Sequence, residues 1–384
     1  MSWNFVLQFG LLPHFIFATI LPFLFVLTII VFFHELGHFL VARWCGIRVL
    51  TFSIGFGPEL VGFNDRHGTR WKLSLIPLGG YVKFFGDENA ASVPDPDAIA
   101  AMNPDERKVS FFHQSVGVRA AVVAAGPIAN FLLAIAIFAT IFALHGKEDI
   151  APRVGEVLPG SAAEAAGFKP GDLVLSINDS TIETFEDMQQ IVSLNADELL
   201  DVVVERDGAK VDLHARPALT TDKDRFGNTY RVGRLGIRPP KSSLENIRTI
   251  KFGPVGALQA ATKQTWFVVD QTFRFLYRFA LGRASTDQLG GPLRIAKMSG
   301  EAASLGFPTL MNFAGLISVS IGLLNLFPIP LLDGGHLLFF GIEAARGRPL
   351  SERVQEIGFR IGLALIIMLM IFTVLNDVSL FRAS

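Results

Sequence analysis

The chain has 384 residues, of which 50% are hydrophobic and only 18% are charged. Its mean hydropathy of +0.43 is too high for a soluble globular protein and too low for a chain that lies wholly in lipid. A net charge of -1 gives no case for a nucleic-acid partner, and the single cysteine, Cys45, excludes an internal disulfide and a Cys-based zinc finger. We therefore expect a bundle of membrane helices with a soluble insertion.

Four uncharged stretches are long enough, or nearly so, to cross a bilayer. They are Leu11–Phe33, Ala120–Leu144, Pro308–Leu332 and Ile361–Leu375. Because no basic residue precedes Arg43, the N-terminus lacks the positive region of a cleaved signal peptide, and we expect the first span to be retained.

Basic residues crowd the loop after the first span and the loop between spans three and four. The positive-inside rule then places both loops in the cytoplasm, and both termini outside. Spans one and three therefore both run inward, and their ends should reach the same depth in the membrane.

An H-E-x-x-H motif, formed by His34, Glu35 and His38, ends the first apolar run. Residues four apart share one face of a helix, so the two histidines can hold one metal ion while Glu35 reaches a water bound to it. Ionisable groups at bilayer depth are costly unless they are paired or bound to metal, which favours a functional site over a chance match.

Asp333 is the acidic group at the end of the third span, in Leu331-Leu-Asp-Gly-Gly-His336. Catalytic zinc usually has three protein ligands and one position for water, and Asp333 is placed to complete that set with His34 and His38. His336 is the rival ligand, and we prefer Asp333. An alternative for Asp333 is a helix cap at the membrane surface.

Pro328 and Pro330 interrupt the third span just before Asp333. Prolines break a helix, and irregular backbone at membrane depth is tolerated where it lines a cavity or is buried in protein. We expect this segment to form part of the active-site wall. Asn325, one turn upstream, could bind an extended substrate backbone or make an interhelical contact.

Two β-rich segments, Val49–Phe63 and Thr69–Phe85, flank the turn signal Asp65-Arg-His-Gly68. They predict a small antiparallel sheet against the active site that could offer an edge strand to a peptide. Gly55 and Gly57 in the first segment are candidate substrate-binding residues. An ordinary cytoplasmic hairpin is the alternative.

Other segments complete the chain. Residues Asn89–Asp105 are typical of a flexible loop, and Gly126-Pro127 predicts a kink in span two, beside which Asn130 could face the site, although helix packing is the preferred interpretation. From about Ile150 to Pro239 short alternating strands mix with one helix. Lys251–Gly282 predicts an amphipathic helix lying on the outer leaflet.

The sequence thus predicts seven regions. They are 1–48, the first transmembrane helix with H-E-x-x-H; 49–117, the β-loop region and flexible loop; 118–146, the second transmembrane helix; 147–240, the inserted domain; 241–305, the amphipathic helix and linker; 306–345, the third transmembrane segment; and 346–384, a cytoplasmic loop and the fourth transmembrane helix.

Several motifs together resemble a known family. Residues 154–178 are similar to a PDZ domain of the bacterial protease type. Two further motifs accompany this insert: His34-Glu-Leu-Gly-His38, and the segment with Asn325, Pro328, Pro330 and Asp333. Together they resemble the site-2 proteases, the intramembrane zinc metalloproteases of family M50, and most closely the bacterial regulator of sigma-E protease group. Well-known members carry two tandem PDZ domains, whereas the length here leaves room for one.

The resemblance implies a polytopic α-helical membrane protein with four transmembrane helices, a membrane-reentrant β-hairpin sheet and one extracytoplasmic PDZ domain of β-rich α+β type. It implies one Zn²⁺ per chain held by His34, His38 and Asp333, with Glu35 activating water. The implied substrates are single-pass membrane proteins such as anti-sigma factors, together with remnant signal peptides. The implied location is the bacterial inner membrane, in a stress response.

We expect peptide hydrolysis within or beside the membrane. A PDZ domain can read a C-terminus by strand addition or act as a steric gate, and we favour the gate. One rival function is a metal transporter, which would need further ligands, and spans two and four contain no Asp, Glu or Cys. The other is a non-catalytic adaptor with a structural metal, against which the intact Glu35 speaks.

Overall fold

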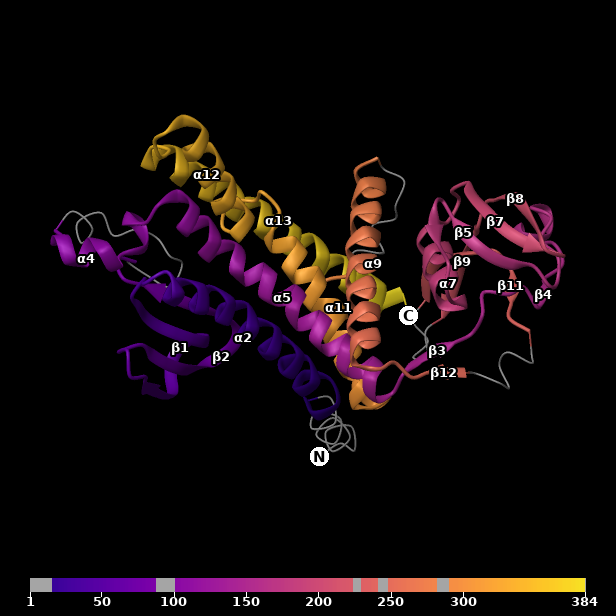
Figure 1. The fold of residues 1–384 in the computed structure, drawn as a ribbon, viewed down its shortest axis with the longest axis horizontal. Helices are drawn as coiled ribbons and strands as arrows, with labels where there is room; N and C mark the ends of the chain where they lie inside the picture. The colour runs from indigo at the N-terminus through magenta and orange to yellow at the C-terminus, as the bar shows by residue number, and fades with distance from the viewer. Residues whose placement is uncertain (1–15, 88–100, 224–228, 241–247, 282–289, 384) are drawn as a thin grey trace, which may run out of the picture. The chain divides into compact units, whose positions relative to one another are not determined.

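The computed structural model describes residues 16–87, 101–223, 229–240, 248–281 and 290–383. It divides into two compact units (Figure 1). Unit 1 comprises residues 1–139, 258–269 and 291–373, and unit 2 comprises 140–257, 270–290 and 374–384. The helices α5 (Val116–Leu144), α9 (Pro254–Ala280) and α13 (Glu352–Ala383) run through the boundaries between the units.

Four helices of the described chain are long and apolar enough to cross a membrane, as the sequence predicts. They span Phe17–Trp44, Val116–Leu144, Phe307–Asn325 and Arg353–Val378. The first combines a π-turn, Ile16–Ile20, with α2, Leu21–Trp44. The predicted start of that span at Leu11 lies outside the described residues.

The third apolar stretch is broken where the prolines predict it. Helix α11, Phe307–Asn325, ends before the Pro328 and Pro330 segment, and α12 begins at Asp333 and runs to Arg346. The break is packed closely against its neighbours: a Cβ on Gly334 or Gly335 would meet the carbonyls of residues 326, 327 or 329. Glycines are therefore needed at the start of α12.

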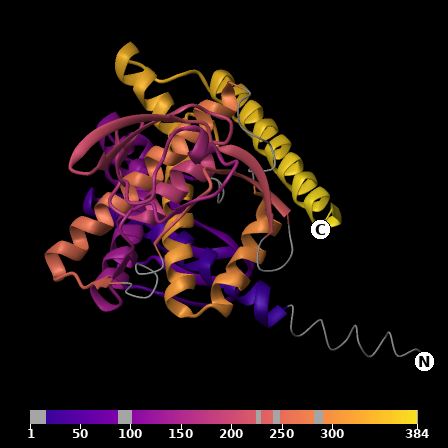
Figure 2. The ribbon, with the colours of Figure 1, turned by 90° about the vertical axis from the view of Figure 1, so that its right-hand side faces the viewer.

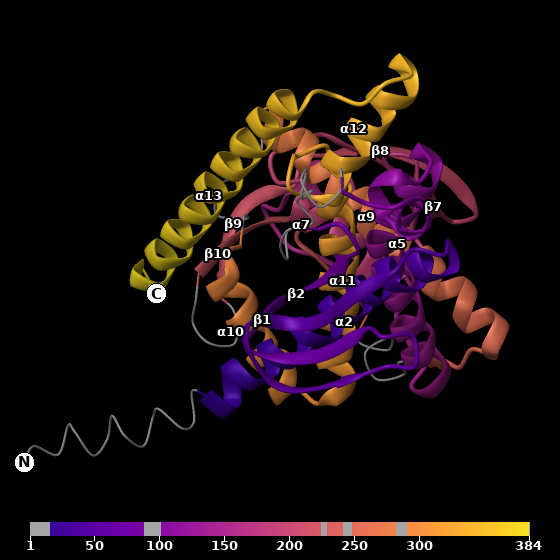
Figure 3. The ribbon, with the colours of Figure 1, turned by 90° about the vertical axis from the view of Figure 1, so that its left-hand side faces the viewer.

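The predicted hairpin is present in unit 1. Strand β1, Val49–Asn64, pairs antiparallel with β2, Arg70–Phe84, and both lie alongside α2 (Figure 3). Gly55 and Gly57 have φ values of 84° and 88°, which favour glycine, where the register of β1 against β2 shifts. Many apolar side chains of the hairpin are exposed: Phe56, Leu60, Val61, Phe63, Leu73, Leu75 and Ile76.

Asp65 organises the turn of the hairpin. Its carboxylate accepts hydrogen bonds from the backbone N–H groups of His67 and Thr69 and from the side chains of Arg43 and Trp71. Burial alone would raise the pKa of Asp65, but these donors lower it to about 2. The bond from Arg43 ties the turn to the end of α2.

The structure contains short elements that the sequence interpretation missed. Helix α10, Pro292–Ser304, occupies part of the predicted linker and packs against α2. A Cβ on its Gly300 would meet the carbonyl of Ala18, so the contact is close. The predicted loop Asn89–Asp105 lies largely outside the described residues, but its end is ordered as Asn103 caps α4, Pro104–Val109, with a capping box. A short 3₁₀ turn, Phe111–His113, follows.

Unit 2 contains the predicted short strands, which face the viewer in Figure 2. A four-stranded antiparallel sheet has the order β6, β5, β7, β8. Its strands are Ser180–Thr181, Leu173–Ile177, Leu200–Arg206 and Ala209–Ala215. Three further antiparallel pairs are present: β3 (Lys147–Asp149) with β12 (Arg248–Ile250), β4 (Glu156–Val157) with β11 (Ile237–Arg238), and β9 (Ala218–Lys223) with β10 (Thr229–Arg234).

Two helices accompany these strands rather than the one expected: the single turn α6, Ala162–Ala165, and α7, Phe185–Leu194. Alternate residues of β7 are buried, which is the pattern of a strand with one face on a core and one in water. The core includes Val154, Phe168, Val174, Ile177, Met188, Leu200, Val202 and Val204.

Candidate metal centre

The two histidines of the H-E-x-x-H motif lie on one face of α2, as their spacing predicts. The Nε2 atoms of His34 and His38 are 3.2 Å apart, and the rings meet edge to face. Two imidazole nitrogens this close together on an apolar helix can supply two of the ligands of one metal ion.

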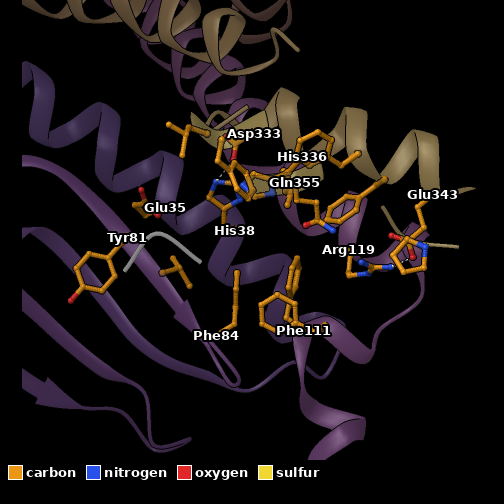
Figure 4. A pocket seen from close by; sticks show the side chains of 18 of the residues that line it. Glu35, His38, Tyr81, Phe84, Phe111, Arg119, Asp333, His336, Glu343 and Gln355 are labelled. Carbon is orange, nitrogen blue, oxygen red and sulfur yellow. Dashed lines mark hydrogen bonds and ion pairs between the residues drawn. The ribbon is translucent and has the colours of Figure 1, made fainter. Parts of the chain in front are cut away.

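The third group is Asp333, the first residue of α12. Its carboxylate oxygens lie 3.2 Å from His34 Nε2 and 3.5 Å from His38 Nε2 (Figure 4). Leu332, not Asp333, is the N-cap residue of α12, so the capping alternative does not describe this side chain. The predicted equal depth of the ends of spans one and three agrees with this contact.

The spacing of these atoms fits a zinc ion. Ligands about 2.0–2.2 Å from a tetrahedral zinc are about 3.3–3.6 Å from one another, close to the observed separations. Asp333 Oδ2 is buried and makes no hydrogen bond of good geometry among the described residues. Gly126 of α5 leaves the necessary space, because a Cβ there would meet His38 Nε2 and lie 2.9 Å from His34 Cε1.

Helix α5 contacts the far side of both imidazole rings. His38 Nδ1 lies 2.9 Å from the carbonyl of Val122, and His34 Nδ1 lies 3.2 Å from the side-chain amide of Asn130. The preferred interpretation of Asn130 as a packing residue was therefore incomplete, since its side chain is fully buried and contacts His34. The glycine and proline just before it, inside an apolar span, are the sequence signal for this position.

Glu35 lies between the histidines and the hairpin. Its Cγ would be 3.0 Å from a Cβ on Gly80, and Val31 lies as close to the same position, so β2 passes directly over this turn of α2. Figure 4 shows Glu35 beside the His38 and Asp333 side chains, toward Tyr81 of β2. The Glu35 carboxylate is thus next to the candidate metal-binding group, which we define as His34, His38 and Asp333, without belonging to it.

A cavity of about 580 Å³ opens beside these residues. His34, Glu35, His38 and Asp333 line it, together with His336 and aromatic side chains from four separate segments: Phe84, Phe111, Phe112, Phe339, Phe340 and Phe359. Sequence reasoning did not identify these aromatic walls, because only the fold brings the segments together. A cavity of this size leaves room for a peptide segment and water beside His34, His38 and Asp333.

A partly buried ion pair lies farther along the same cavity. Arg119 Nη2 is 2.6 Å from Glu343 Oε1, and both side chains are only 13% exposed. The Arg119 guanidinium also stacks over the ring of Phe340 at 4.9 Å. This pair joins the start of α5 to α12, the helix that begins with Asp333.

The remaining candidates lie outside the metal-binding group. His336 lines the cavity, but among the described residues the three atoms that gather within 4.8 Å belong to His34, His38 and Asp333. The predicted substrate-binding residues do not line the cavity; these are Asn325, Pro328, Pro330, Gly55 and Gly57. Pro330 instead packs against α13, where its carbonyl leaves no space for a Cβ on Gly362.

The sequence is similar to several bacterial proteins that are named as metalloproteases. A family model described as Peptidase family M50 matches residues 22–369. A relative from Rhizobium meliloti (strain 1021) that carries a zinc metalloprotease name is 51% identical over 361 residues, covering 94% of this chain and 96% of the relative. One from Brucella suis biovar 1 (strain 1330), similarly named, is 50% identical over 360 residues, covering 94% and 95%.

Metalloprotease MmpA of Caulobacter vibrioides is 40% identical over 378 residues, covering 93% of this chain and 94% of that protein. The family match reaches into all four apolar helices and covers both segments that supply the gathered histidines and aspartate. Zinc, the metal in the relatives' names, agrees with the donor set and its spacing. The chain is therefore a membrane-embedded zinc metalloprotease that belongs to peptidase family M50.

Proposed function

We propose that this protein is an intramembrane endopeptidase in which His34, His38 and Asp333 hold one zinc ion and Glu35 transfers the proton. The observation that carries the proposal is the gathering of three ligand atoms within 4.8 Å beside Glu35, among helices apolar enough to span a bilayer. Ionisable groups at such depth are functional by default.

Zinc, when bound, polarises the scissile carbonyl and makes water a stronger nucleophile. The Glu35 carboxylate accepts a proton from the attacking water and delivers it to the leaving amide nitrogen. The two histidines remain neutral ligands, while Asp333 supplies the negative charge. The aromatic walls of the cavity exclude bulk water and hold the substrate segment.

Helical peptide bonds are hidden from a nucleophile, so a membrane-spanning substrate must unwind first. The hairpin offers compensation for the lost helical hydrogen bonds, since β1 and β2 form a two-stranded sheet in the described chain and each has an edge with no strand beside it. Gly80 places β2 against Glu35, so a strand added to the sheet would run close to the catalytic group. Gly55, Gly57, Asn325, Pro328 and Pro330 would contact the substrate outside the cavity.

The substrates that we propose are single-pass membrane proteins, of the anti-sigma factor type, together with remnant signal peptides. Residues 147–240 would form one PDZ domain that limits access as a gate; the antiparallel sheets and the capped helix α7 are consistent with such a module. The basic loops favour an inner-membrane protein with this domain and both termini outside the cytoplasm.

The test is cleavage of a tagged single-pass substrate by the detergent-purified protein, comparing wild type with Glu35→Gln and quantifying zinc in both. We expect cleavage by wild type only, with about one zinc per chain in each preparation. Cleavage by the Glu35→Gln variant would overturn the role of Glu35. Zinc in both preparations without cleavage in either, across several single-pass substrates, would favour the adaptor function.

A further inference from the structure

The outer partners of the two histidines come from one helix. Val122 and Asn130 both belong to α5, on either side of Gly126, which leaves the space for the metal-binding group. Helices α2 and α12 supply the ligand atoms, whereas α5 contacts the ring nitrogens that face away from them. Partners of this kind fix which nitrogen of a ligand histidine carries hydrogen.

The hydrogen placement follows from the chemistry of imidazole. A neutral imidazole that binds metal through Nε2 carries its hydrogen on Nδ1, and that N–H needs an acceptor. His38 has one, because its Nδ1 donates to the Val122 carbonyl at 2.9 Å. His34 has only the Asn130 side chain at its Nδ1 among the described residues.

The amide of Asn130 can supply that acceptor by turning over. Its nitrogen lies 3.2 Å from His34 Nδ1, while its Oδ1 is buried without a hydrogen-bond partner in the described chain. The amide oxygen and nitrogen have nearly the same size, so a half-turn about the Cβ–Cγ axis exchanges them without changing the packing. After this exchange the Asn130 Oδ1 accepts a hydrogen bond from His34 Nδ1–H, so the buried oxygen has a donor and the histidine has an acceptor.

The position of Asn130 is itself held by another helix. Ser318 of α11 donates a hydrogen bond to the Asn130 backbone carbonyl at 2.8 Å, and both residues are fully buried. Gly322, one turn along α11, approaches so closely that a Cβ there would be 3.1 Å from Asn130 Cβ. The backbone contacts hold the residue in place and leave its side chain for His34.

We infer that Asn130 is a positioning residue of the zinc site, whose side-chain oxygen accepts the hydrogen of His34 Nδ1 and holds that ring in the metal-binding tautomer. The inference rests on the zinc ligands assigned under the proposed function. Loss of an outer partner of a ligand histidine typically lowers metal affinity about 10- to 100-fold.

The experiment measures zinc affinity of the full-length, detergent-purified chain by competition with a chelator, for wild type, Asn130→Ala, Asn130→Ser and Asn130→Asp. The alanine side chain fits the same space but has no acceptor, and serine is too short to reach His34. Both should bind zinc about 10- to 100-fold more weakly. Asn130→Asp keeps an acceptor and should bind within about threefold of wild type or more tightly.

A packing role predicts the opposite order. An aspartate buried among helices is costlier than alanine, so Asn130→Asp would then be the worst variant. Gly117→Ala is the matched control: it lies on the same helix, α5, a Cβ there meets nothing within 4 Å, and it should not change zinc affinity. A folded Asn130→Ala or Asn130→Ser chain with wild-type affinity would overturn the inference.

Cobalt substitution gives a second readout that does not depend on turnover. The visible spectrum of Co²⁺ reports ligand geometry, and we expect it to change in Asn130→Ala and to be unchanged in Gly117→Ala. If wild type binds no zinc, or if Glu35→Gln cleaves substrate, the proposed function fails. If wild type behaves as expected and Asn130→Ala binds zinc equally well, only the role of Asn130 fails.

Discussion

The metal-binding region of unit 1 and the sheet of unit 2 use polar side chains in opposite ways. Around the two histidines of unit 1, polar side chains are largely buried among apolar helices and contact one another: His34 and His38 meet Asp333, and Arg119 meets Glu343. In unit 2 the polar groups mostly lie outside an apolar core, where they cap helices and close turns, as Thr184 does for α7.

The apolar surfaces differ in the same sense. Much of α13 is exposed and apolar, including Ile361, Leu363, Met368, Leu369, Met370, Ile371 and Phe372, whereas β7 buries alternate residues. Exposed apolar helices are suited to lipid, and alternating strands are suited to water. An ionisable side chain buried among the membrane helices therefore indicates function, whereas one buried in unit 2, such as Asp172, indicates stability.

The largest expected contrast comes from making the same substitution in both units. Asp333→Asn should lower zinc affinity and cleavage by more than about 100-fold, because losing only a hydrogen-bond partner of a metal ligand already costs up to that factor. Asp172→Asn in unit 2 should leave both quantities unchanged. Zinc analysis and cleavage assays on the purified variants measure this. An Asp333→Asn chain with wild-type zinc content would return His336 as the third ligand.

The space around the metal gives the next largest effect. Gly126→Ala would place a Cβ against His38 Nε2. We expect zinc affinity to fall about 10- to 100-fold, the same range as for losing a hydrogen-bond partner of a metal ligand. Gly117→Ala on the same helix is the matched control, since a Cβ there meets nothing within 4 Å. Equal zinc affinity in the two variants would show that α5 does not confine the site.

The stability of unit 2 should depend on the pair between Asp172 and Arg206. Arg206 donates two hydrogen bonds of 2.7 Å to the Asp172 carboxylate, which is almost fully buried. We expect Asp172→Asn to lower the free energy of unfolding of unit 2 by about 2 kcal/mol, the range for hydrogen bonds to charged groups. Hydrogen exchange of unit 2 amides in the full-length chain measures this, with catalytic activity as the unchanged control.

The same pair predicts a dependence on pH. Burial alone would raise the pKa of Asp172, but the bonds from Arg206 and from the backbone N–H of Lys169 lower it below the usual 3.8. A group with a lowered folded pKa adds stability above its unfolded pKa of about 3.9 and loses it as pH falls through the folded value. The stability difference between wild type and Asp172→Asn should therefore shrink below about pH 4; a difference that is constant with pH would contradict this.

The smallest effect should come from the cap of α7. The Thr184 hydroxyl accepts from the backbone N–H of Asp187, and the Asp187 carboxylate accepts from the backbone N–H of Thr184. Thr184→Ala should lower the free energy of unfolding of unit 2 by about 1 kcal/mol. Thr184→Ser, which keeps the hydroxyl, should be close to wild type, and hydrogen exchange of α7 would detect an unexpected loss.

Local sequence signals predicted the elements that depend on local physics. The spacing of His34 and His38 is a property of one helix, the prolines at 328 and 330 end α11 whatever surrounds them, and Asp65 and Gly68 mark the turn of the hairpin. The positive-inside rule also helped, because two spans expected to run in the same direction should end at the same depth, and this predicted that Asp333 would meet the histidines without any knowledge of packing.

Features that depend on contacts between distant segments could not be predicted in this way. The Val122 carbonyl that receives His38 is a backbone atom with no sequence signal, and the cavity combines aromatic residues from strands and helices far apart in the chain. Helix α10 was missed because its Pro292 start follows a glycine-rich turn, and the hydrophobic pattern within its 13 residues is short. Asn130 lay between these cases, since its position was noticed but its partner was not.

The ligand set also has a consequence for chain connectivity. His38 and Asp333 lie on helices near opposite ends of the sequence, so a zinc ion between them would act as a cross-link that closes residues 39–332 into a single loop. The entropy of closing such a loop grows only with the logarithm of its length, and doubling it costs about 0.6 kcal/mol. Domains could therefore be added to or removed from the middle of the chain while the metal centre stays intact.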